Sequence, residues 1–468
     1  MLKNKKGQSI LEILIAVGIA IVSISAGSML FFGNQTTFLD QRNYLTGSGL
    51  TSECIEASKE IYNRDWNELT AGSHGMFYNA TAKSWSYASS SSDVSGIFTR
   101  IATISTTSIS NIKDLKCTVS WSIDPDRPQH IDMYYKFSNS LGLYGDWSNP
   151  RTFGAIDLGA GNEGTDLSVR NKIVYMTTKA SSGPKLDFHV VDATNPASPF
   201  IVKSINTGIG LMAIDVYGDY AYVASESDVR QFQIINIATN NNPFLVSSSS
   251  TSGNGEEGLS VAYSNGYAFV GIENSISGPE LTIFNVSNPA SPTIASFYEI
   301  GGDLNQIFLK DNYAYLITSL NNSQIIVLDV SNPASPIFVT KYDVYGNMAG
   351  KSIDIIGNLI YYGSNNEPDP NGREFYILDS LNFPTLTSTG TANINADLND
   401  VYVKDYLAFM ATGDTNNEFM LYDISNVKNI TLISTLNFPQ GARAIDYESN
   451  YVYVAVKSND SLRIISSQ

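Results

Sequence analysis

The chain has 468 residues, of which only 16% are charged, and its formal net charge is −17 at pH 7. Glycine, serine, asparagine and tyrosine are abundant and lysine and arginine are scarce, which favours β-structure with many turns and excludes a helical or nucleic-acid-binding class of protein. The acidity serves solubility outside the cell; it also repels nucleic acid and anionic membrane surfaces while suiting cations and basic partners.

A lysine-rich leader, residues 1–7, precedes an almost unbroken apolar run at the N-terminus. The run extends from Ile13 to Ala26 and from Met29 to Phe32. It is long enough to span a bilayer as a helix, which takes about 20 residues, and the lysines before it predict a cytoplasmic N-terminus. An ordinary secretory signal would place small residues for cleavage after the run, and no such site is evident there.

The residues around Gly7 form a different processing motif. Gly7 stands before the apolar run and a single acid, Glu12, lies just inside it. This arrangement resembles the class III signal of type IV prepilins, in which a peptidase cuts after the glycine and the new N-terminus is methylated. The resemblance puts the cut between Gly7 and Gln8, although the family often has phenylalanine where this chain has Gln8.

A carboxylate within a lipid-facing run is costly and normally marks function. The resemblance implies that Glu12 pairs with the N-terminal amine of a neighbouring subunit in a filament core. Residues 8–34 are then a transmembrane or filament-core helix. The alternative interpretation is an ordinary signal anchor with a stray acid.

Residues 35–148 are expected to form a pilin-like α+β head. Apolar side chains at three- and four-residue spacing continue the helix to about Leu69: Leu50, Cys54, Ala57 and Ile61. Short strand candidates of a small antiparallel sheet follow at 84–87, 97–106, 115–123 and 130–137.

The two cysteines lie on surfaces that are expected to face each other. Cys54 belongs to the apolar stripe of the helix, and Cys117 lies on the apolar face of a strand in which apolar and polar residues alternate. A disulfide between them is predicted after export to an oxidising compartment. The alternative is that both are free, buried and small hydrophobic residues.

The rest of the chain, residues 149–468, is repetitive. The sequence Asn-Pro-Ala-Ser-Pro occurs at 195–199, 288–292 and 332–336. Aromatic residues, each at the centre of a short strand, recur at separations of 47, 47, 46, 46, 48 and 44: Tyr175, Tyr222, Phe269, Tyr315, Tyr361, Phe409 and Tyr453. A period of about 45 residues with four strands per unit is typical of a β-propeller blade, so seven units predict seven blades.

The last repeat stops after its third strand, Leu462 to Ile465. The segment from Asn149 to Asp157 is similar to the one that follows each Asn-Pro pair. A strand near 152–158 is therefore predicted to complete the last blade and to close the ring, which removes an exposed edge. An open solenoid is the alternative, but it needs no complementary half-unit.

Each Asn-Pro pair follows an apolar strand that ends in Asp or Asn, as in Phe188 to Asp192 and Val327 to Asp329. These repeats resemble the LVIVD-type propeller repeat of bacterial surface proteins over residues 150–468. That family has no agreed catalytic residues. The predicted fold class is mainly β: a seven-bladed β-propeller, preceded by a pilin-like α+β domain with a long N-terminal hydrophobic helix.

Motifs for catalysis are missing from the sequence, so neither enzymatic activity nor a cofactor is predicted. His74 and His130 fall outside the repeats, and His189 occupies a strand position where other repeats carry other residue types. Gly-x-Ser-x-Gly, phosphate-loop and Cys-x-x-Cys motifs do not occur. A buried aspartate pair in the propeller channel is left open.

One loop has the residue types of a calcium site. It places oxygen ligands at alternate positions before Gly372, as an EF-hand loop does: Glu367, Asp369 and Asn371. Leu378 stands where the loop's final acid is expected, and Pro370 restricts its shape. A plain turn between strands is the alternative to calcium binding.

The loops between the second and third strands of the repeats vary most. Variable loops on a rigid scaffold are where recognition usually resides, and we expect them on the face opposite the connections between blades. Acidic residues make them a candidate ligand face: Glu226, Asp228, Glu273, Glu280, Glu367, Asp369, Asp414 and Asp460. The alternative is that these surface loops vary in sequence without a role in recognition.

The chain is therefore predicted to be a non-enzymatic minor subunit of a type IV pilus-like filament that displays a propeller for adhesion or partner binding. The expected partners are other pilin subunits through the N-terminal helix, the inner membrane before assembly, the prepilin peptidase, and a surface protein or glycan, but no nucleic acid. The expected location is the cell membrane before assembly and then the pilus or cell surface. The alternatives are a pseudopilin of a type II secretion or DNA-uptake system, and a surface-anchored propeller enzyme acting on glycans.

Overall fold

The computed structural model describes residues 23–25, 40–62, 68–79, 84–88, 90–106, 112–122, 128–138, 145–159, 161–180, 185–251, 255–275, 278–366 and 373–468. Gly7, Gln8 and Glu12 lie outside these ranges, as does nearly all of the predicted helix at 8–34. Within these ranges, no helix is both long and apolar enough to cross a membrane. The chain divides into two compact units, Met1–Ser140 and Leu141–Gln468.

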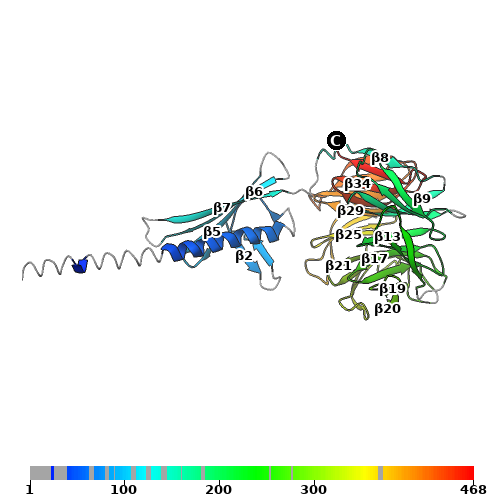
Figure 1. Cartoon of the computed structure of the whole chain (residues 1–468), viewed down its shortest axis with the longest axis horizontal. Helices are drawn as coiled ribbons and strands as arrows, with labels where there is room; N and C mark the ends of the chain where they lie inside the picture. The colour runs from blue at the N-terminus through cyan, green and yellow to red at the C-terminus, as the bar shows by residue number, and fades with distance from the viewer. Residues whose placement is uncertain are drawn as a thin grey trace, which may run out of the picture. The chain divides into compact units, whose positions relative to one another are not determined.

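In the first unit, a helix over residues 40–62 packs against an antiparallel sheet (Figure 1). The sheet has the strand order β1-β5-β6-β7, with β4 paired to β5, and β2 and β3 form a separate hairpin. The strands are β1 (Gly72–His74), β2 (Met76–Asn79), β3 (Ser84–Tyr87), β4 (Asp93–Ser95), β5 (Phe98–Thr106), β6 (Ile112–Trp121) and β7 (Gln129–Ser138). The shared core joins the apolar stripe of the helix to alternate residues of the sheet, such as Ala102, Leu115 and Phe137.

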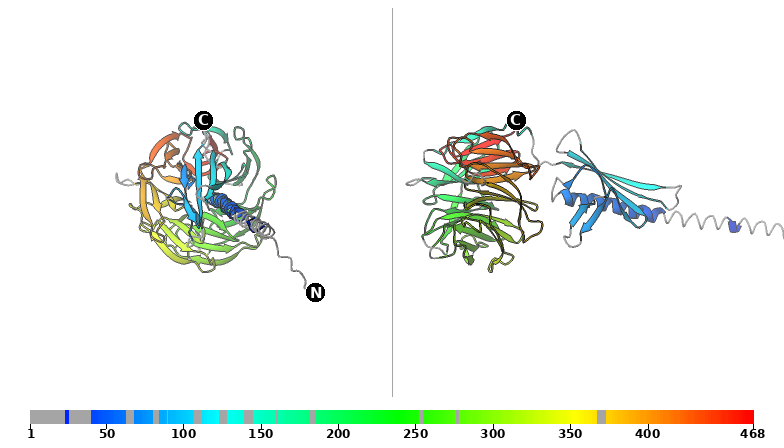
Figure 2. Two further views of the ribbon diagram at one scale, coloured as in Figure 1. Left: turned by 90° about the vertical axis from the view of Figure 1, so that its left-hand side faces the viewer. Right: turned by 180° about the vertical axis from the view of Figure 1, so that it is seen from behind.

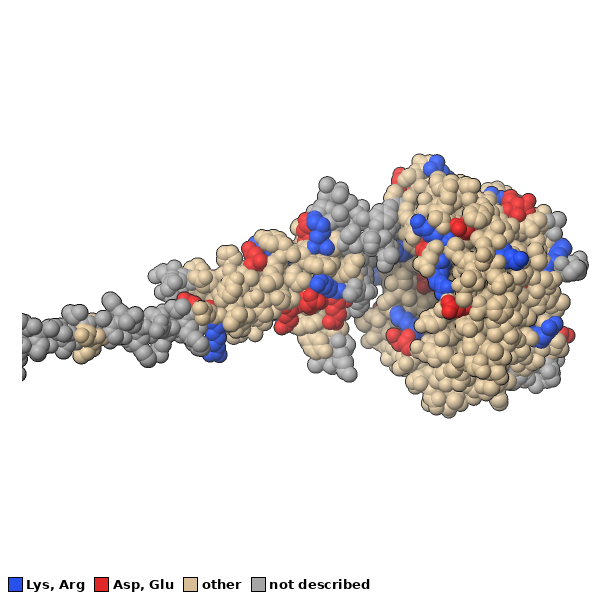
Figure 3. Space-filling view, in the orientation of Figure 1, with Lys and Arg blue, Asp and Glu red and all other residues tan. Residues whose placement is uncertain are grey.

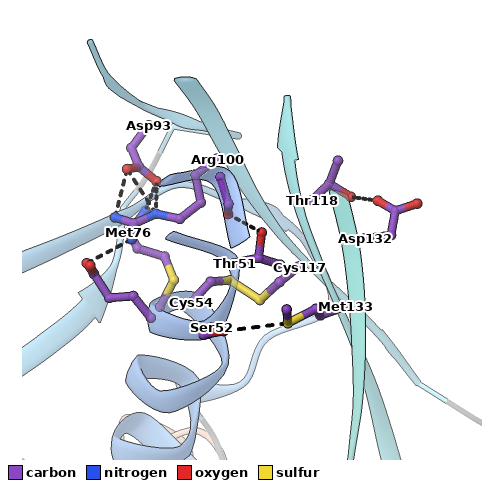
Figure 4. The surroundings of a disulfide bond; sticks show 12 residues. Thr51, Ser52, Cys54, Met76, Asp93, Arg100, Cys117, Thr118, Asp132 and Met133 are labelled. Atoms are coloured by element: carbon purple, nitrogen blue, oxygen red, sulfur yellow. Dashed lines mark hydrogen bonds and ion pairs between the residues drawn. A yellow bond between two sulfur atoms is a disulfide. The ribbon is translucent and has the colours of Figure 1, made fainter. Parts of the chain in front are cut away.

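Cys54 of the helix and Cys117 of β6 are joined by a disulfide, with their Cα atoms 6.2 Å apart (Figure 4). Both cysteines are fully buried. Above the bridge, the buried guanidinium of Arg100 binds Asp93 at 2.9 Å and Glu53 at 3.0 Å. The helix is therefore attached to the sheet by a covalent bond, an apolar core and a shared ion pair.

The second unit is a ring of seven four-stranded antiparallel sheets around a central axis (Figure 2). The first strands of the seven blades are β9 (Asn162–Arg170), β13 (Leu211–Tyr217), β17 (Gly258–Ser264), β21 (Leu304–Lys310), β25 (Gly350–Ile356), β29 (Leu398–Lys404) and β33 (Ala442–Glu448). First strands of successive blades contact one another around the ring, so they form its inner wall.

The second strands are β10 (Ile173–Ala180), β14 (Tyr220–Ser225), β18 (Tyr267–Ile272), β22 (Tyr313–Thr318), β26 (Leu359–Ser364), β30 (Leu407–Thr412) and β34 (Tyr451–Val456). The third strands are β11 (Phe188–Asp192), β15 (Phe232–Asn236), β19 (Leu281–Asn285), β23 (Ile325–Asp329), β27 (Phe375–Asp379), β31 (Phe419–Asp423) and β35 (Leu462–Ser466). The outermost strands are β12 (Phe200–Ile205), β16 (Phe244–Ser249), β20 (Thr293–Tyr298), β24 (Ile337–Tyr342), β28 (Thr387–Ala392), β32 (Thr431–Leu436) and β8 (Arg151–Ile156).

The ring closes as the half-unit in the sequence predicts. Strand β8 is the fourth strand of the last blade, with Ile156 opposite Leu462 and Arg151 opposite Ser466. Glu448 of that blade also accepts the backbone N–H groups of the hairpin at residues 171 and 172 in the first blade. Because β33 and β9 are also in contact, the unit is a closed propeller and not an open solenoid.

The repeated Asp/Asn and Asn-Pro residues build the turn that follows each third strand. In the first blade, the Asp192 carboxylate accepts the N–H of Thr194 at 2.8 Å, and the Asn195 side chain accepts the N–H of Ala197 at 3.3 Å. Side chains that bind the backbone two residues further on are typical of such turns. The repeat signature therefore has a local structural role in each turn.

Candidate functional site

A cavity of about 440 Å³ lies at the centre of the ring and is lined by the first strands of all seven blades. The inner edge of each first strand has no further strand to pair with. Its backbone N–H groups therefore need other acceptors. Half-buried polar side chains on the same strands supply them: Asp166, Asp215, Gln306, Asp354, Asp400 and Asp446.

Each of these side chains accepts a backbone N–H from the first strand of the next blade. Asp166 binds the N–H of Ile214 at 2.8 Å, and Asp446 binds that of Val169 at 2.7 Å across the junction that closes the ring. Asp166 also accepts the N–H of Leu167 at 2.8 Å with its second oxygen. One carboxylate oxygen therefore joins two blades and the other binds the backbone of its own strand, which gives a structural reason for these acids.

Two positions for this side chain alternate around the ring. In one position the side chain lies opposite the second residue after the central aromatic of the second strand, as for Asp166, Gln306 and Asp400. In the other it lies opposite the aromatic itself, as for Asp215, Asp354 and Asp446. Seven is an odd number, so strict alternation cannot continue around the whole ring. The third blade breaks it: there Ser260 donates to the carbonyl of Leu304 at 2.8 Å instead.

The channel carboxyls hold their protons more strongly than ordinary aspartates. Burial raises the pKa of Asp166 and of Asp446 to about 7, and the pKa of Asp354 to about 6. Burial also raises the pKa of Asp400 well above its usual value, with a further contribution from the charge of Asp166. The middle of the channel is consequently far less negative at neutral pH than its composition implies.

The expectation that the variable loops and the connections between blades lie on opposite faces is wrong. The N–H of Glu226, in a second-to-third loop, donates to Gly210 of a connection at 3.1 Å, and the N–H of Lys457 donates to Gly441 in the same way at 2.9 Å. The cause is simple: strand direction alternates within an antiparallel blade, so the second and fourth strands end at the same edge.

The prediction that Glu280 belongs to an acidic ligand face is also wrong. Its side chain is fully buried, and one carboxylate oxygen accepts the N–H groups of Ile300 at 2.8 Å and Gly301 at 2.9 Å. Corresponding side chains bind the connection to the next blade in the same way: Asp187, Gln231, Gln324, Glu374 and Glu418. Glu280 is one member of a repeated internal brace.

We expect Glu280→Ala to lower the free energy of unfolding of the propeller by about 3 kcal/mol, because the backbone N–H groups of Ser275, Ile300 and Gly301 lose a charged acceptor. Urea unfolding of the full chain measures this. Asp228→Ala, an exposed acid in a variable loop, is the matched control and should change stability by less than about 0.5 kcal/mol. Equal stability of the two variants would contradict the brace.

The other acidic residues of the predicted face have mixed roles. Glu226 is largely buried and forms an ion pair with Lys179. Asp414 accepts N–H groups within its own loop, and Asp460 pairs with Arg463 at 2.6 Å. Asp228 is exposed and Glu273 is half-buried.

The candidate calcium ligands Glu367, Asp369 and Asn371 lie outside the described residues. Among the residues that are described, no group of three or more His, Cys, Asp or Glu side chains is arranged to hold a metal ion. On the side of the propeller in view in Figure 3, charged side chains are scattered over a mostly uncharged surface.

Sequence reasoning missed a ring of side chains in this channel, one from each blade. In each blade, the central aromatic of the second strand pairs with one residue of the first strand. The channel side chain belongs to the residue three positions before that partner: Thr165, Met212, Leu259, Asn305, Lys351, Asn399 and Arg443. We call these seven residues the channel ring. Aligning the repeats on their aromatics is the signal that finds it, because the residue at this position changes from blade to blade.

A family model described as the LVIVD repeat matches residues 211–251, 258–299 and 301–344, a narrower range than the predicted 150–468. These matches fall on the second, third and fourth blades. No curated protein matches the chain.

Several solved structures are similar to the chain in fold. The WD40 β-propeller domain of Doa1 is 9% identical with a TM-score of 0.50, and the match covers 68% of this chain and 97% of that one. A catalytically inactive virginiamycin B lyase from Staphylococcus aureus, with quinupristin, is 11% identical with a TM-score of 0.52 and coverages of 68% and 100%. A chain of a mitotic checkpoint complex is 11% identical with a TM-score of 0.52 and coverages of 69% and 98%. At these identities the likeness shows the propeller fold alone.

Proposed function

We propose that the chain is a minor, pilin-like subunit of a type IV pilus-like filament and that its propeller is a binding head displayed at the cell surface. The observation that carries the proposal is the presence, in one chain, of a prepilin-like N-terminus and a closed propeller. Gly7, Gln8 and Glu12 stand at the spacing of the class III signal. The propeller is complete within its own unit because β8 closes it.

The first unit supports this proposal. A helix over residues 40–62, later in the sequence than the apolar run, packs against a small antiparallel sheet, which is the arrangement expected of a pilin head. The disulfide between Cys54 and Cys117 favours an oxidising compartment outside the cytoplasm. Other pilin subunits, the membrane before assembly and the prepilin peptidase are the partners that this function requires.

A binding role suits the propeller because its fold is braced at repeated internal positions while the channel ring and the variable loops differ between blades. A rigid scaffold with variable residues at one site is the usual arrangement for recognition. So large a head would crowd a repeated filament shaft. A minor subunit, at the tip, avoids that crowding.

Immunogold electron microscopy of intact cells, with antibody against residues 150–468, tests the proposal. Label is expected at filament tips. Glu12→Ala should abolish the filament label while the amount of chain in the membrane fraction is unchanged, because the assembly contact is lost and the fold is not. Label confined to the envelope would sink the proposal and favour a pseudopilin or an anchored enzyme.

A further inference from the structure

The channel ring has an apolar part and a polar part, and Thr165 of the first blade, between them, donates its hydroxyl to the carbonyl of Leu211 at 2.7 Å. Met212 and Leu259, from the second and third blades, are apolar. The fourth to seventh blades contribute Asn305, Lys351, Asn399 and Arg443, which are polar or cationic. All of them line the same cavity, whose volume of about 440 Å³ falls in the range of small-molecule sites.

The two cations of the ring have no direct partner. Neither Lys351 nor Arg443 makes a hydrogen bond or an ion pair with any residue that the structure describes. Lys351 is half-buried, and burial lowers the pKa of its ammonium group. A desolvated cation without a partner is costly, so an anion beside Lys351 would be stabilising; Arg443, in contrast, is exposed.

Among the described residues, two carboxylates lie near Lys351 without forming an ion pair with it. Asp303 and Asp397 are near enough to Lys351 to influence its charge, but each accepts a loop N–H, from Asn274 at 2.9 Å and Asn366 at 2.8 Å respectively. The neighbouring Lys179 is already paired with Glu226. The ring therefore keeps two unpaired positive groups in an otherwise satisfied wall.

The remaining polar members of the ring are held in fixed orientations. The amide nitrogen of Asn305 donates to the carbonyl of Gly350 at 2.7 Å, and that of Asn399 donates to the carbonyl of Ala442 at 2.7 Å. One N–H of each amide is thereby committed, which fixes the side chain and leaves the amide oxygen as an acceptor for ligand hydroxyl groups. The ring combines cations, hydroxyl acceptors and an apolar wall.

We propose that the channel ring binds a carboxylate-bearing sugar of an acidic polysaccharide, with the carboxylate between Lys351 and Arg443 and a carbon-rich face of the sugar against Met212 and Leu259. The planar fork of an arginine matches the two oxygens of a carboxylate. The sugar's hydroxyl groups meet the oxygens of Asn305 and Asn399. This inference rests on the proposed function, because a displayed head is what brings the ring to such a polymer.

The probe is oligogalacturonate, with its methyl ester as the uncharged counterpart, titrated calorimetrically into the full chain in detergent. The acid form is expected to bind about a hundredfold more tightly than the ester. Lys351→Met and Arg443→Gln should each weaken binding of the acid about tenfold, as expected for loss of one hydrogen bond to a charged group. Lys203→Met, an exposed lysine on the outermost strand β12, is the matched control and should bind like the unaltered chain.

Equal affinity for the acid and the ester would overturn the proposal, and so would unchanged binding by both variants with native unfolding midpoints. Preferential binding of a sulfated oligosaccharide would overturn the carboxylate assignment. The experiment is independent of where the chain resides in the cell. Binding of oligogalacturonate by a chain that is never found on filaments would leave this inference standing and remove the proposed function, and the reverse result would do the opposite.

Discussion

Lowering the pH from about 7.5 to about 5 is expected to stabilise the propeller, whereas many proteins lose stability on acidification. The reason is the set of channel carboxyls that join the blades. Burial raises the pKa of Asp166 and Asp446 to about 7 and that of Asp354 to about 6. In the unfolded chain the same groups titrate near pH 4.

The sign follows from proton binding. Between about pH 4 and pH 7, these aspartates are protonated in the folded state and ionised in the unfolded state. The folded state therefore binds more protons, and stability is lost as the pH rises through the folded pKa values. His189 acts in the opposite direction, since burial lowers its pKa to about 4, but it is a single group. A net loss on the order of 1–2 kcal/mol per pH unit is expected near pH 6.

Urea unfolding at a series of pH values measures this dependence. The propeller contains one tryptophan, Trp147, which packs edge-on against Phe409 with ring centroids 4.9 Å apart. With the other tryptophans replaced by phenylalanine (Trp66, Trp85 and Trp121), fluorescence of Trp147 reports the propeller alone.

Asp166→Asn combined with Asp446→Asn is the informative variant pair. An amide resembles the protonated carboxyl that each aspartate carries in the folded state at acidic pH, so stability there should change little. The pH dependence should flatten because two titrating groups are gone. A dependence as steep as that of the unaltered chain would show that other groups carry it.

The propeller could be predicted from sequence because each blade repeats the same pattern of strands and aromatic residues. Seven aromatics at nearly equal spacing fix the number of blades, and the strand near residue 152 has no place in a first blade that already has four strands. The disulfide could be predicted from sequence for a related reason. Cys54 and Cys117 each lie on the apolar face of a short periodic segment, and both faces pack into one core.

The functional face could not be read in the same way, because an acidic residue beside a loop looks exposed in sequence. Glu280 immediately precedes the buried strand β19 and binds the backbone twenty residues further on, a contact that only the fold creates. The repeats do indicate that this position is structural, because Glu374 and Glu418 occupy the same position as Glu280 in other blades. Residues that recur at one position in many repeats belong to the scaffold, and those that differ, such as Lys351 and Arg443, are better candidates for binding.

Replacing both cysteines by alanine, Cys54→Ala with Cys117→Ala, is expected to lower the stability of the first unit by about 4 kcal/mol. The bridge joins residues 63 positions apart, and in the chain-entropy description a loop of that length gives about this value. A small unit has little core to compensate for the loss. Both sulfur atoms are fully buried, so the double alanine variant also leaves a small cavity, which adds to the loss.

The propeller is the control within the same chain. Cys54 and Cys117 are the only cysteines in the sequence, so the unfolding midpoint reported by Trp147 should not move. The midpoint reported by Trp85 and Trp121, which lie in the first unit, should fall markedly, and a reducing agent should have the same effect on the unaltered chain. An equal shift of both transitions would mean that the two units unfold together. An unchanged first transition would mean that the apolar core and the Arg100 ion pairs suffice to hold the helix on the sheet.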